Sequence, residues 1–171
     1  ARSGAGCSVI SGIELALWDL RGKALKQPVY ELLGGGVRSG IPVYASSGPS
    51  VWPLDDLVSK VGHYAQIGYR TTKLSTGFYQ IPPASKMGNQ VRLEHVHFPF
   101  SERLDRLVEG FTRLRKEFGS AMDYAIDGHQ GAEPNPIPVT EAVATAEALA
   151  PFRMRFYEEP LAYTNIDGYC E

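Results

Sequence analysis

Polar residues that could carry out chemistry follow three short apolar segments of the chain. Lys73 and Ser75 lie at the end of the first segment, Asp127 and His129 at the end of the second, and Glu158 at the end of the third. Carboxylates suit Mg²⁺, which prefers hard oxygen ligands. A metal beside a bound carboxylate would stabilise the charge that forms when the adjacent carbon loses its proton. The five residues therefore predict metal-assisted proton abstraction.

Charged residues at the ends of strands are common, because these ends meet solvent. At any single position solvent exposure is the better explanation, but three successive segments that end in this way favour a site. The two-residue period of a strand places Lys73 and Ser75 on the same face. His129 lies two residues beyond Asp127, close enough to reach a substrate bound at the metal.

Other histidines and acids have simpler explanations. His95 and His97 have the spacing that would put two imidazoles on one face of a strand, as in a zinc site, but no third ligand is adjacent in the sequence. We expect this pair to serve loop packing or substrate contact. His63 is expected on a helix surface, and Glu159 is expected to anchor a loop.

Hydrophobic spacing predicts the elements that would position these residues. Stripes with helical period indicate helices, and short apolar runs bounded by turn residues indicate strands. The stretch 76–100 is too long for a routine connection and is expected to be a functional loop or a lid. The predicted helices span residues 8–26, 28–33, 54–66, 101–118 and 140–150, and the predicted strands span residues 41–45, 69–74, 122–126 and 152–157.

Strands that alternate with helices predict an α/β fold with a parallel sheet and right-handed crossovers. In parallel α/β barrels the catalytic groups sit at the carboxyl ends of the strands. The polar residues named above occupy these positions.

Composition narrows the class of protein. The 171 residues carry a net charge of −2, which gives no basic surface for nucleic acid, and no apolar run is long enough to span a bilayer. Cys7 and Cys170 lack metal or redox spacing, so we expect two reduced thiols and a cytoplasmic protein. The chain opens on Ala1 and stops at Glu171, and we expect it to be an internal fragment of a longer protein.

Several segments resemble one family. Residues 13–24 (IELALWDLRGKA) and 28–35 (PVYELLGG) resemble the end of the capping domain in the mandelate racemase branch of the enolase superfamily. Residues 42–45 (PVYA) resemble its first barrel strand, and residues 156–161 (FYEEPL) resemble the strand that carries its second metal ligand. The resemblance implies an α/β fold that is the first half of a (β/α) TIM-type barrel, preceded by the last helix of an α+β capping domain. It divides the chain into 1–39, the end of that domain with its linker, and 40–171, the first four βα units.

The resemblance also implies roles for the site residues. Asp127 and Glu158 would be the first and second ligands of Mg²⁺, and Lys73 would bind the substrate carboxylate or stabilise the enediolate. Ser75 stands where racemases of the family place a basic lysine, so we expect it to bind substrate instead. The Asp-x-His arrangement is similar to that of acid-sugar dehydratases, in which the histidine protonates the departing hydroxyl, a role that falls here to His129.

The sequence therefore predicts a Mg²⁺-dependent lyase that dehydrates a sugar acid of the aldonate or aldarate class through loss of the proton next to the carboxylate. The alternatives are a racemase or epimerase of the same superfamily, or a non-catalytic fragment that acts as a binding or assembly module. The general base and the third metal ligand are expected outside this chain, which by itself should be inactive and should not form a stable monomer. We expect a homo-oligomer with a small-molecule substrate and no nucleic-acid or membrane partner.

Overall fold

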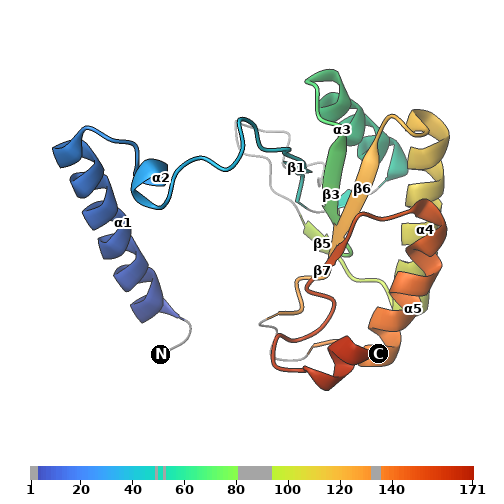
Figure 1. Ribbon diagram of the computed structural model, residues 1–171. Helices are drawn as coiled ribbons and strands as arrows, with labels where there is room; N and C mark the ends of the chain where they lie inside the picture. The colour runs from blue at the N-terminus through green and yellow to red at the C-terminus, as the bar shows by residue number, and fades with distance from the viewer. Residues whose placement is uncertain (1–3, 49, 52, 81–93, 132–135) are drawn as a thin grey trace. The chain divides into compact units, whose positions relative to one another are not determined.

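The computed structural model describes residues 4–48, 50–51, 53–80, 94–131 and 136–171 (Figure 1). The chain divides into two compact units, Ala1–Pro42 and Val43–Glu171. Among the described residues, no helix is both long and apolar enough to cross a membrane.

The first unit contains two helices, α1 (Ala5–Leu25) and α2 (Val29–Leu32). Helix α1 ends at Lys26, which takes a left-handed conformation (φ 54°) and donates its backbone N–H to Lys23 O. Pro28 precedes α2, where its fixed φ suits the start of a helix and its missing N–H costs nothing. Both helices were predicted, and α1 begins three residues earlier than the periodicity indicated.

The second unit is built on a four-stranded parallel sheet. Its order is β1 (Ala45–Ser46), β3 (Thr71–Ser75), β6 (Asp123–Asp127) and β7 (Tyr157–Glu158), and every neighbouring pair is parallel. The helices α3 (Leu54–Gln66), α4 (Phe100–Phe118) and α5 (Val139–Leu149) alternate with these strands along the chain. The predicted α/β fold with a parallel sheet is confirmed.

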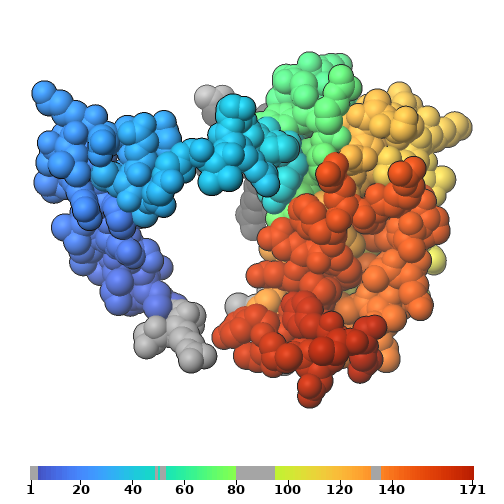
Figure 2. Space-filling view, viewed as in Figure 1, coloured from blue at the N-terminus to red at the C-terminus, as the bar shows by residue number. Residues whose placement is uncertain are grey.

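The core lies between this sheet and the helices that cover it (Figure 1). The helices and strands each turn an apolar stripe toward it, as the helical and strand spacings indicated. The space-filling view shows the outer face of the unit that α5 and the chain beyond β7 form, in orange and red (Figure 2). The core side chains are Leu57 and Val61 of α3, Leu107, Phe111 and Leu114 of α4, Leu74 and Phe78, Met122, Tyr124 and Ile126, and Leu149.

Two predicted strands are much shorter than expected. The strand predicted over residues 41–45 is reduced to Ala45–Ser46, because Pro42 has no N–H for a ladder and Ile41 and Val43 remain exposed. The strand predicted over 152–157 begins at Tyr157, because Ala150–Phe152 continues α5 as a 3₁₀-helix. A second 3₁₀-helix, Asp167–Cys170, follows β7.

A second sheet was not predicted. It has the order β2 (Ser50–Val51), β4 (Phe78–Gln80) and β5 (Glu94–Val96), in which β4 and β5 are antiparallel. The stretch 76–100, expected to be a functional loop or a lid, therefore contains the strands β4 and β5. Residues 81–93, the middle of that stretch, lie outside the described residues.

Candidate active site

The ends of three neighbouring strands bring an ammonium and two carboxylates together. The Nζ of Lys73 donates a hydrogen bond to Asp127 Oδ2 at 2.8 Å and another to Glu158 Oε2. The side chains of Lys73 and Asp127 are only 11% and 9% exposed, whereas that of Glu158 is 43% exposed. The cluster is therefore closed on the side of β3 and β6 and open on the side of β7.

Sheet register explains this convergence. Ser75 is paired with Asp127 across β3 and β6, and Asp127 is paired with Glu158 across β6 and β7. The carboxyl ends of the strands are tied by backbone hydrogen bonds from Thr76 N to Asp127 O and from Gly128 N to Glu158 O, each at 2.9 Å. Because side chains alternate along a strand, Lys73 lies on the same face as Ser75, one period behind it.

The charge of Lys73 is set by its partners. Burial alone would lower the pKa of Lys73, but the hydrogen bonds and charges of Asp127 and Glu158 together outweigh burial and raise this pKa above its usual value. Lys73 thus stays an ammonium at physiological pH and cannot accept a proton. One ammonium against two carboxylates leaves the cluster with a net negative charge, which favours binding of a further cation.

Two aromatic rings lie beside the cluster, and the sequence analysis did not predict them. The Nζ of Lys73 lies 6.0 Å from the ring centre of Tyr44, and this ring packs edge-on against Phe156 at 5.6 Å. The ring face of a tyrosine attracts a cation. An aromatic residue immediately before β1 was the available signal, but the role depends on the pairing of β1 with β3 and could not be derived from spacing.

His129 lies beside Asp127. Its backbone N–H donates to Asp127 Oδ1 at 3.0 Å, and its Nε2 lies 3.5 Å from Asp127 Oδ2. The backbone of His129 has a positive φ of 53°, a conformation that costs energy for a residue with a Cβ. The imidazole is 61% exposed, so it faces solvent at the open side of the cluster, where a substrate could meet it.

Gly128, between Asp127 and His129, permits a close approach of two strand ends. A Cβ at this position would lie 2.6 Å from the carbonyl oxygen of Glu159 and 3.2 Å from the ring of Tyr157. Glu159 turns away from the cluster, because its carboxylate lies against Gly131 and its carbonyl accepts a hydrogen bond from Gln130 N at 3.1 Å.

Ser75 is held by the turn that follows β3. Its Oγ accepts a hydrogen bond from Gly77 N at 3.0 Å, and its carbonyl oxygen accepts one from Ser50 Oγ at 2.6 Å. The side chain is buried. His95 lies on β5 in the second sheet, and His97 directly follows this strand. A Cβ at Gly77 would lie 3.2 Å from His95 Nε2 and 3.5 Å from Ser75 Oγ, so His95 approaches the turn that holds Ser75.

The donor set fits a hard divalent ion. Asp127 and Glu158 already direct carboxylate oxygens at one positive group, the Lys73 ammonium, as they would at a metal. Within the described part of the chain, no cluster of three His, Cys, Asp or Glu side chains could hold a metal. The described residues therefore bring together two carboxylate ligands of an oxygen site.

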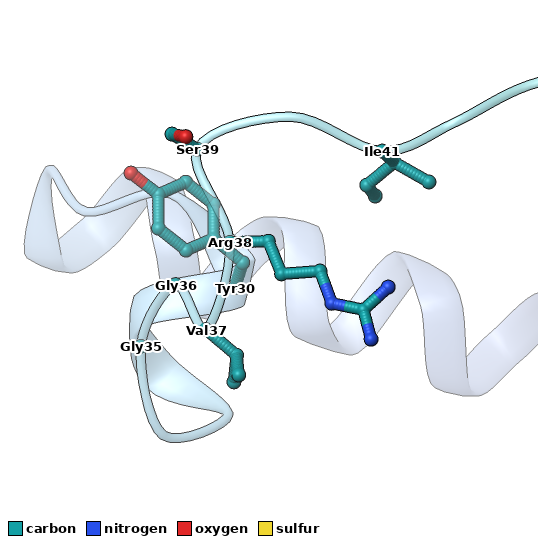
Figure 3. Close-up of a pocket in the computed structure, with 7 residues that line it drawn as sticks. All are labelled: Tyr30, Gly35, Gly36, Val37, Arg38, Ser39 and Ile41. Atoms are coloured by element: carbon teal, nitrogen blue, oxygen red, sulfur yellow. The ribbon is translucent and has the colours of Figure 1, made fainter.

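A cavity of about 650 Å³ lies elsewhere, in the first unit (Figure 3). The loop after α2 forms it, with Tyr30, Arg38 and Ile41 among its lining residues. No acid or histidine lines it. Without a carboxylate or an imidazole it lacks the groups proposed here for Mg²⁺ binding and proton transfer, so we do not assign the chemistry to it.

Comparison with known proteins shows two family matches. Residues 56–171 match the family described as enolase C-terminal domain-like. Residues 4–34 match the N-terminal domain of mandelate racemase and muconate lactonizing enzyme. The first match spans most of the second unit and includes every residue of the Lys73 cluster.

Individual relatives agree with these matches. The D-galactonate dehydratase of Xanthomonas campestris pv. campestris (strain B100) is 32% identical over 166 residues, which are 95% of this chain and 37% of the relative. The 3,6-anhydro-D-galactonate cycloisomerase of Zobellia galactanivorans is 26% identical with a TM-score of 0.69, over 99% of this chain and 39% of that one. An enolase from Pantoea ananatis, solved with bound D-gluconate and Mg, is 24% identical with a TM-score of 0.69, over 91% of this chain and 40% of that one.

The chain spans only about two fifths of the length of the curated relatives, between 37% and 41%. The solved structures with the same fold extend beyond it to a similar degree.

Proposed function

The chain belongs to the mandelate racemase and muconate lactonizing enzyme family of the enolase superfamily, and from this premise we propose that the full-length protein is a Mg²⁺-dependent hydro-lyase that dehydrates a sugar acid. Within it, residues 1–39 would end a capping domain with its linker, and residues 40–171 would supply the first four βα units of a TIM-type barrel. The matches of residues 4–34 to an N-terminal domain family and of residues 56–171 to a C-terminal domain family support this division.

The observation that carries the proposal is the convergence of the Asp127 and Glu158 carboxylates on one cationic group at the ends of β6 and β7. These two residues would hold Mg²⁺. When bound there, the ion would stabilise the negative charge that develops on the substrate carboxylate as the adjacent carbon loses its proton.

Lys73 would act on the same charge. Its ammonium is fixed at the cluster and stays protonated, so it can bind the substrate carboxylate or stabilise the enediolate but cannot remove the proton. Ser75 would add a contact to the substrate, because its Oγ accepts a hydrogen bond from Gly77 and its own O–H can still donate.

His129 would be the general acid. Its backbone is anchored on Asp127, and its exposed imidazole at the open side of the cluster could hand a proton to the hydroxyl that leaves the sugar acid. The base would come from a part of the protein outside this chain, since Lys73 is protonated and the hydroxyl of Ser75 is too weak to remove a proton from carbon.

A racemase or epimerase would need a base on each face of the substrate. The serine at position 75 supplies none on β3, so dehydration is the better supported reaction. The relative from Xanthomonas campestris is named a D-galactonate dehydratase, which supports an aldonate as the substrate class for this protein. We also propose that it is a cytoplasmic homo-oligomer.

The test uses a full-length protein that contains this chain, incubated with Mg²⁺ and D-galactonate or D-gluconate. Formation of a 2-keto-3-deoxy acid is followed, and Mg²⁺ affinity is measured by calorimetry. Asp127→Asn and Glu158→Gln should each weaken Mg²⁺ binding and abolish product formation.

Asp123→Asn is the matched control. Asp123 lies on the same strand as Asp127, but it pairs with Arg155 at 2.7 Å with a side chain that is 44% exposed. This variant should keep both Mg²⁺ affinity and turnover. Unchanged Mg²⁺ affinity in Asp127→Asn, or exchange of the substrate proton without loss of water, would overturn the proposal.

A further inference from the structure

The second sheet contains a pair of imidazoles that the proposed reaction does not use. His95 lies on β5 and His97 directly follows this strand, and their ring centres are 4.2 Å apart. The Nδ1 of His95 lies 3.2 Å from Nδ1 and 3.3 Å from Nε2 of His97. Both side chains are exposed, so an ion in solution can reach them.

Neighbouring residues orient His95. Tyr79 stands directly opposite it on β4 and packs edge-on against its ring, with ring centres 4.9 Å apart. On the other side, a Cβ at Gly77 would lie 3.2 Å from His95 Nε2, so the glycine makes room for the imidazole. With Nε2 directed at Gly77, the Nδ1 edge of His95 is the one that faces His97.

The separation of the nitrogens fits a shared metal ion. Two nitrogens bound to one Zn²⁺ at about 2.0–2.1 Å with tetrahedral angles are about 3.3 Å apart. The separations of 3.2 and 3.3 Å, which also allow a hydrogen bond between the two rings, match this value.

The local charge also suits a metal. Burial, and then the charges of His97 and Arg103, lower the pKa of His95, so its imidazole is neutral at neutral pH, the form that binds metal. Arg103 is a cation that would oppose a second one, but its guanidinium pairs with Glu141 at 3.3 Å. The repulsion at the histidines is thereby reduced.

We propose that His95 and His97 form a two-nitrogen site for a borderline transition-metal ion of the Zn²⁺ or Cu²⁺ class, made of other residues than the oxygen site at Asp127 and Glu158. The proposed site takes one nitrogen ligand from each histidine, and water would fill the remaining coordination positions. Imidazole nitrogen selects Zn²⁺, Cu²⁺ and Ni²⁺ over Mg²⁺, so the two sites sort their ions by ligand type.

The test titrates ZnCl₂ or CuCl₂ into the full-length protein by calorimetry, in excess Mg²⁺ and with the cysteine thiols alkylated. Excess Mg²⁺ fills the oxygen site, and alkylation removes competing sulfur ligands. The parent protein should bind one ion that His97→Ala and His95→Ala each weaken at least tenfold, with Cu²⁺ tighter than Zn²⁺. The Cu²⁺ spectrum of the parent by electron paramagnetic resonance should show coupling to nitrogen.

His63→Ala is the control, since His63 is an exposed histidine on α3, away from this pair. It should bind as the parent does, and circular dichroism without metal should show that all variants are folded. Equal Zn²⁺ affinity in the parent and in His97→Ala would overturn the proposal. So would a His97→Ala variant that loses sugar-acid affinity but not metal affinity, because the pair would then be a substrate contact. Neither result bears on Mg²⁺ binding by Asp127.

Discussion

Asp127 and Glu158 lie directly opposite one another at the ends of β6 and β7, and their carboxylates share one partner, the ammonium of Lys73. Two carboxylates held this close repel each other unless a cation lies between them. In the structure Lys73 supplies that cation. The proposed metal would take over the same role, so Lys73 and Mg²⁺ would have overlapping electrostatic functions at this position.

Lys73→Met should therefore destabilise the protein most when no divalent ion is present. Loss of the ammonium leaves Asp127 and Glu158 without their shared counter-ion, and removing one partner of such a pair costs about 1–3 kcal/mol. The free energy of unfolding, measured by urea denaturation in EDTA, should fall by that amount. Added Mg²⁺ should restore part of the loss, while turnover of the sugar acid stays low.

Lys23→Met is the control for this experiment. Lys23 pairs with Asp19 one helical turn away on α1, but the two side chains are 76% and 61% exposed. Exposed pairs of this kind contribute about 0.3–0.5 kcal/mol. A Lys73→Met variant as stable as the parent in EDTA would show that the ammonium is not the cation that holds the two carboxylates together.

His129→Asn should lower kcat by about 10²–10⁴-fold, the usual contribution of a general acid. Mg²⁺ affinity, measured by calorimetry, should stay near that of the parent, because the contact between His129 and Asp127 that fixes the loop is a backbone N–H bond, which asparagine retains. His63→Asn, on the surface of α3, should keep full turnover. Loss of Mg²⁺ binding in His129→Asn would instead make His129 a ligand.

The order of the elements could be predicted from the sequence because it depends on local periodicity. The stripe of α3 was placed at residues 54–66, the bounds of the helix itself, and that of α4 within one residue. The ends of β1 and β7 could not be predicted, because they depend on which residues find a neighbouring strand. Phe152 and Met154 are apolar enough for a strand, yet they pack beside the core from outside the sheet.

Part of the candidate site could also be predicted from the sequence, because it too depends on local patterns. Lys73, Asp127 and Glu158 could be picked out as polar residues at the ends of apolar runs. Three features of the site could not be predicted, because they depend on sheet register. They are the hydrogen bonds among these residues, the ring of Tyr44 beside them and the exposure of Glu158. The antiparallel pairing of β4 with β5 brings His95 against Tyr79. This pairing depends on contacts between two separate segments, which no local pattern encodes.

Gly128→Ala should disturb the site without touching a polar group. The new Cβ would lie 2.6 Å from the carbonyl of Glu159, so the end of β7 must move away from β6. Overpacking of this kind costs about 1–3 kcal/mol in the free energy of unfolding. Because Asp127 and Glu158 flank the clash, Mg²⁺ affinity and turnover should fall as well, and calorimetry and product formation would measure both.

Gly12→Ala gives the comparison for this change. Gly12 is on α1, and no atom lies within 4 Å of a Cβ placed there. Alanine favours a helix over glycine by about 1 kcal/mol, so this variant should be unchanged or slightly more stable. Normal Mg²⁺ affinity in Gly128→Ala would mean that the strand ends tolerate the shift and that their close approach is not required for the metal.

Tyr124→Phe should change how stability depends on pH above 10. The Tyr124 phenol is fully buried in the core, and burial, aided by the charge of Asp123 and partly opposed by Arg115, raises its pKa to about 12. The unfolded chain ionises near a pKa of about 10, so between these values the folded state holds the proton more tightly. The corresponding stability is present below pH 10 and is lost as pH rises toward 12, with a slope of up to about 1.4 kcal/mol per pH unit.

Phenylalanine cannot ionise, so in Tyr124→Phe that part of the alkaline fall should vanish when urea denaturation is followed from pH 8 to 12. At pH 8 the variant should be about 1 kcal/mol less stable, because the hydroxyl no longer donates to Leu114 O at 3.2 Å. Tyr163→Phe, at an exposed position, should follow the parent curve throughout. Tyr124→Phe could instead lose stability above pH 10 as steeply as the parent. Ionisation of other groups would then drive alkaline unfolding, and the pKa of the buried phenol would not be raised as its surroundings imply.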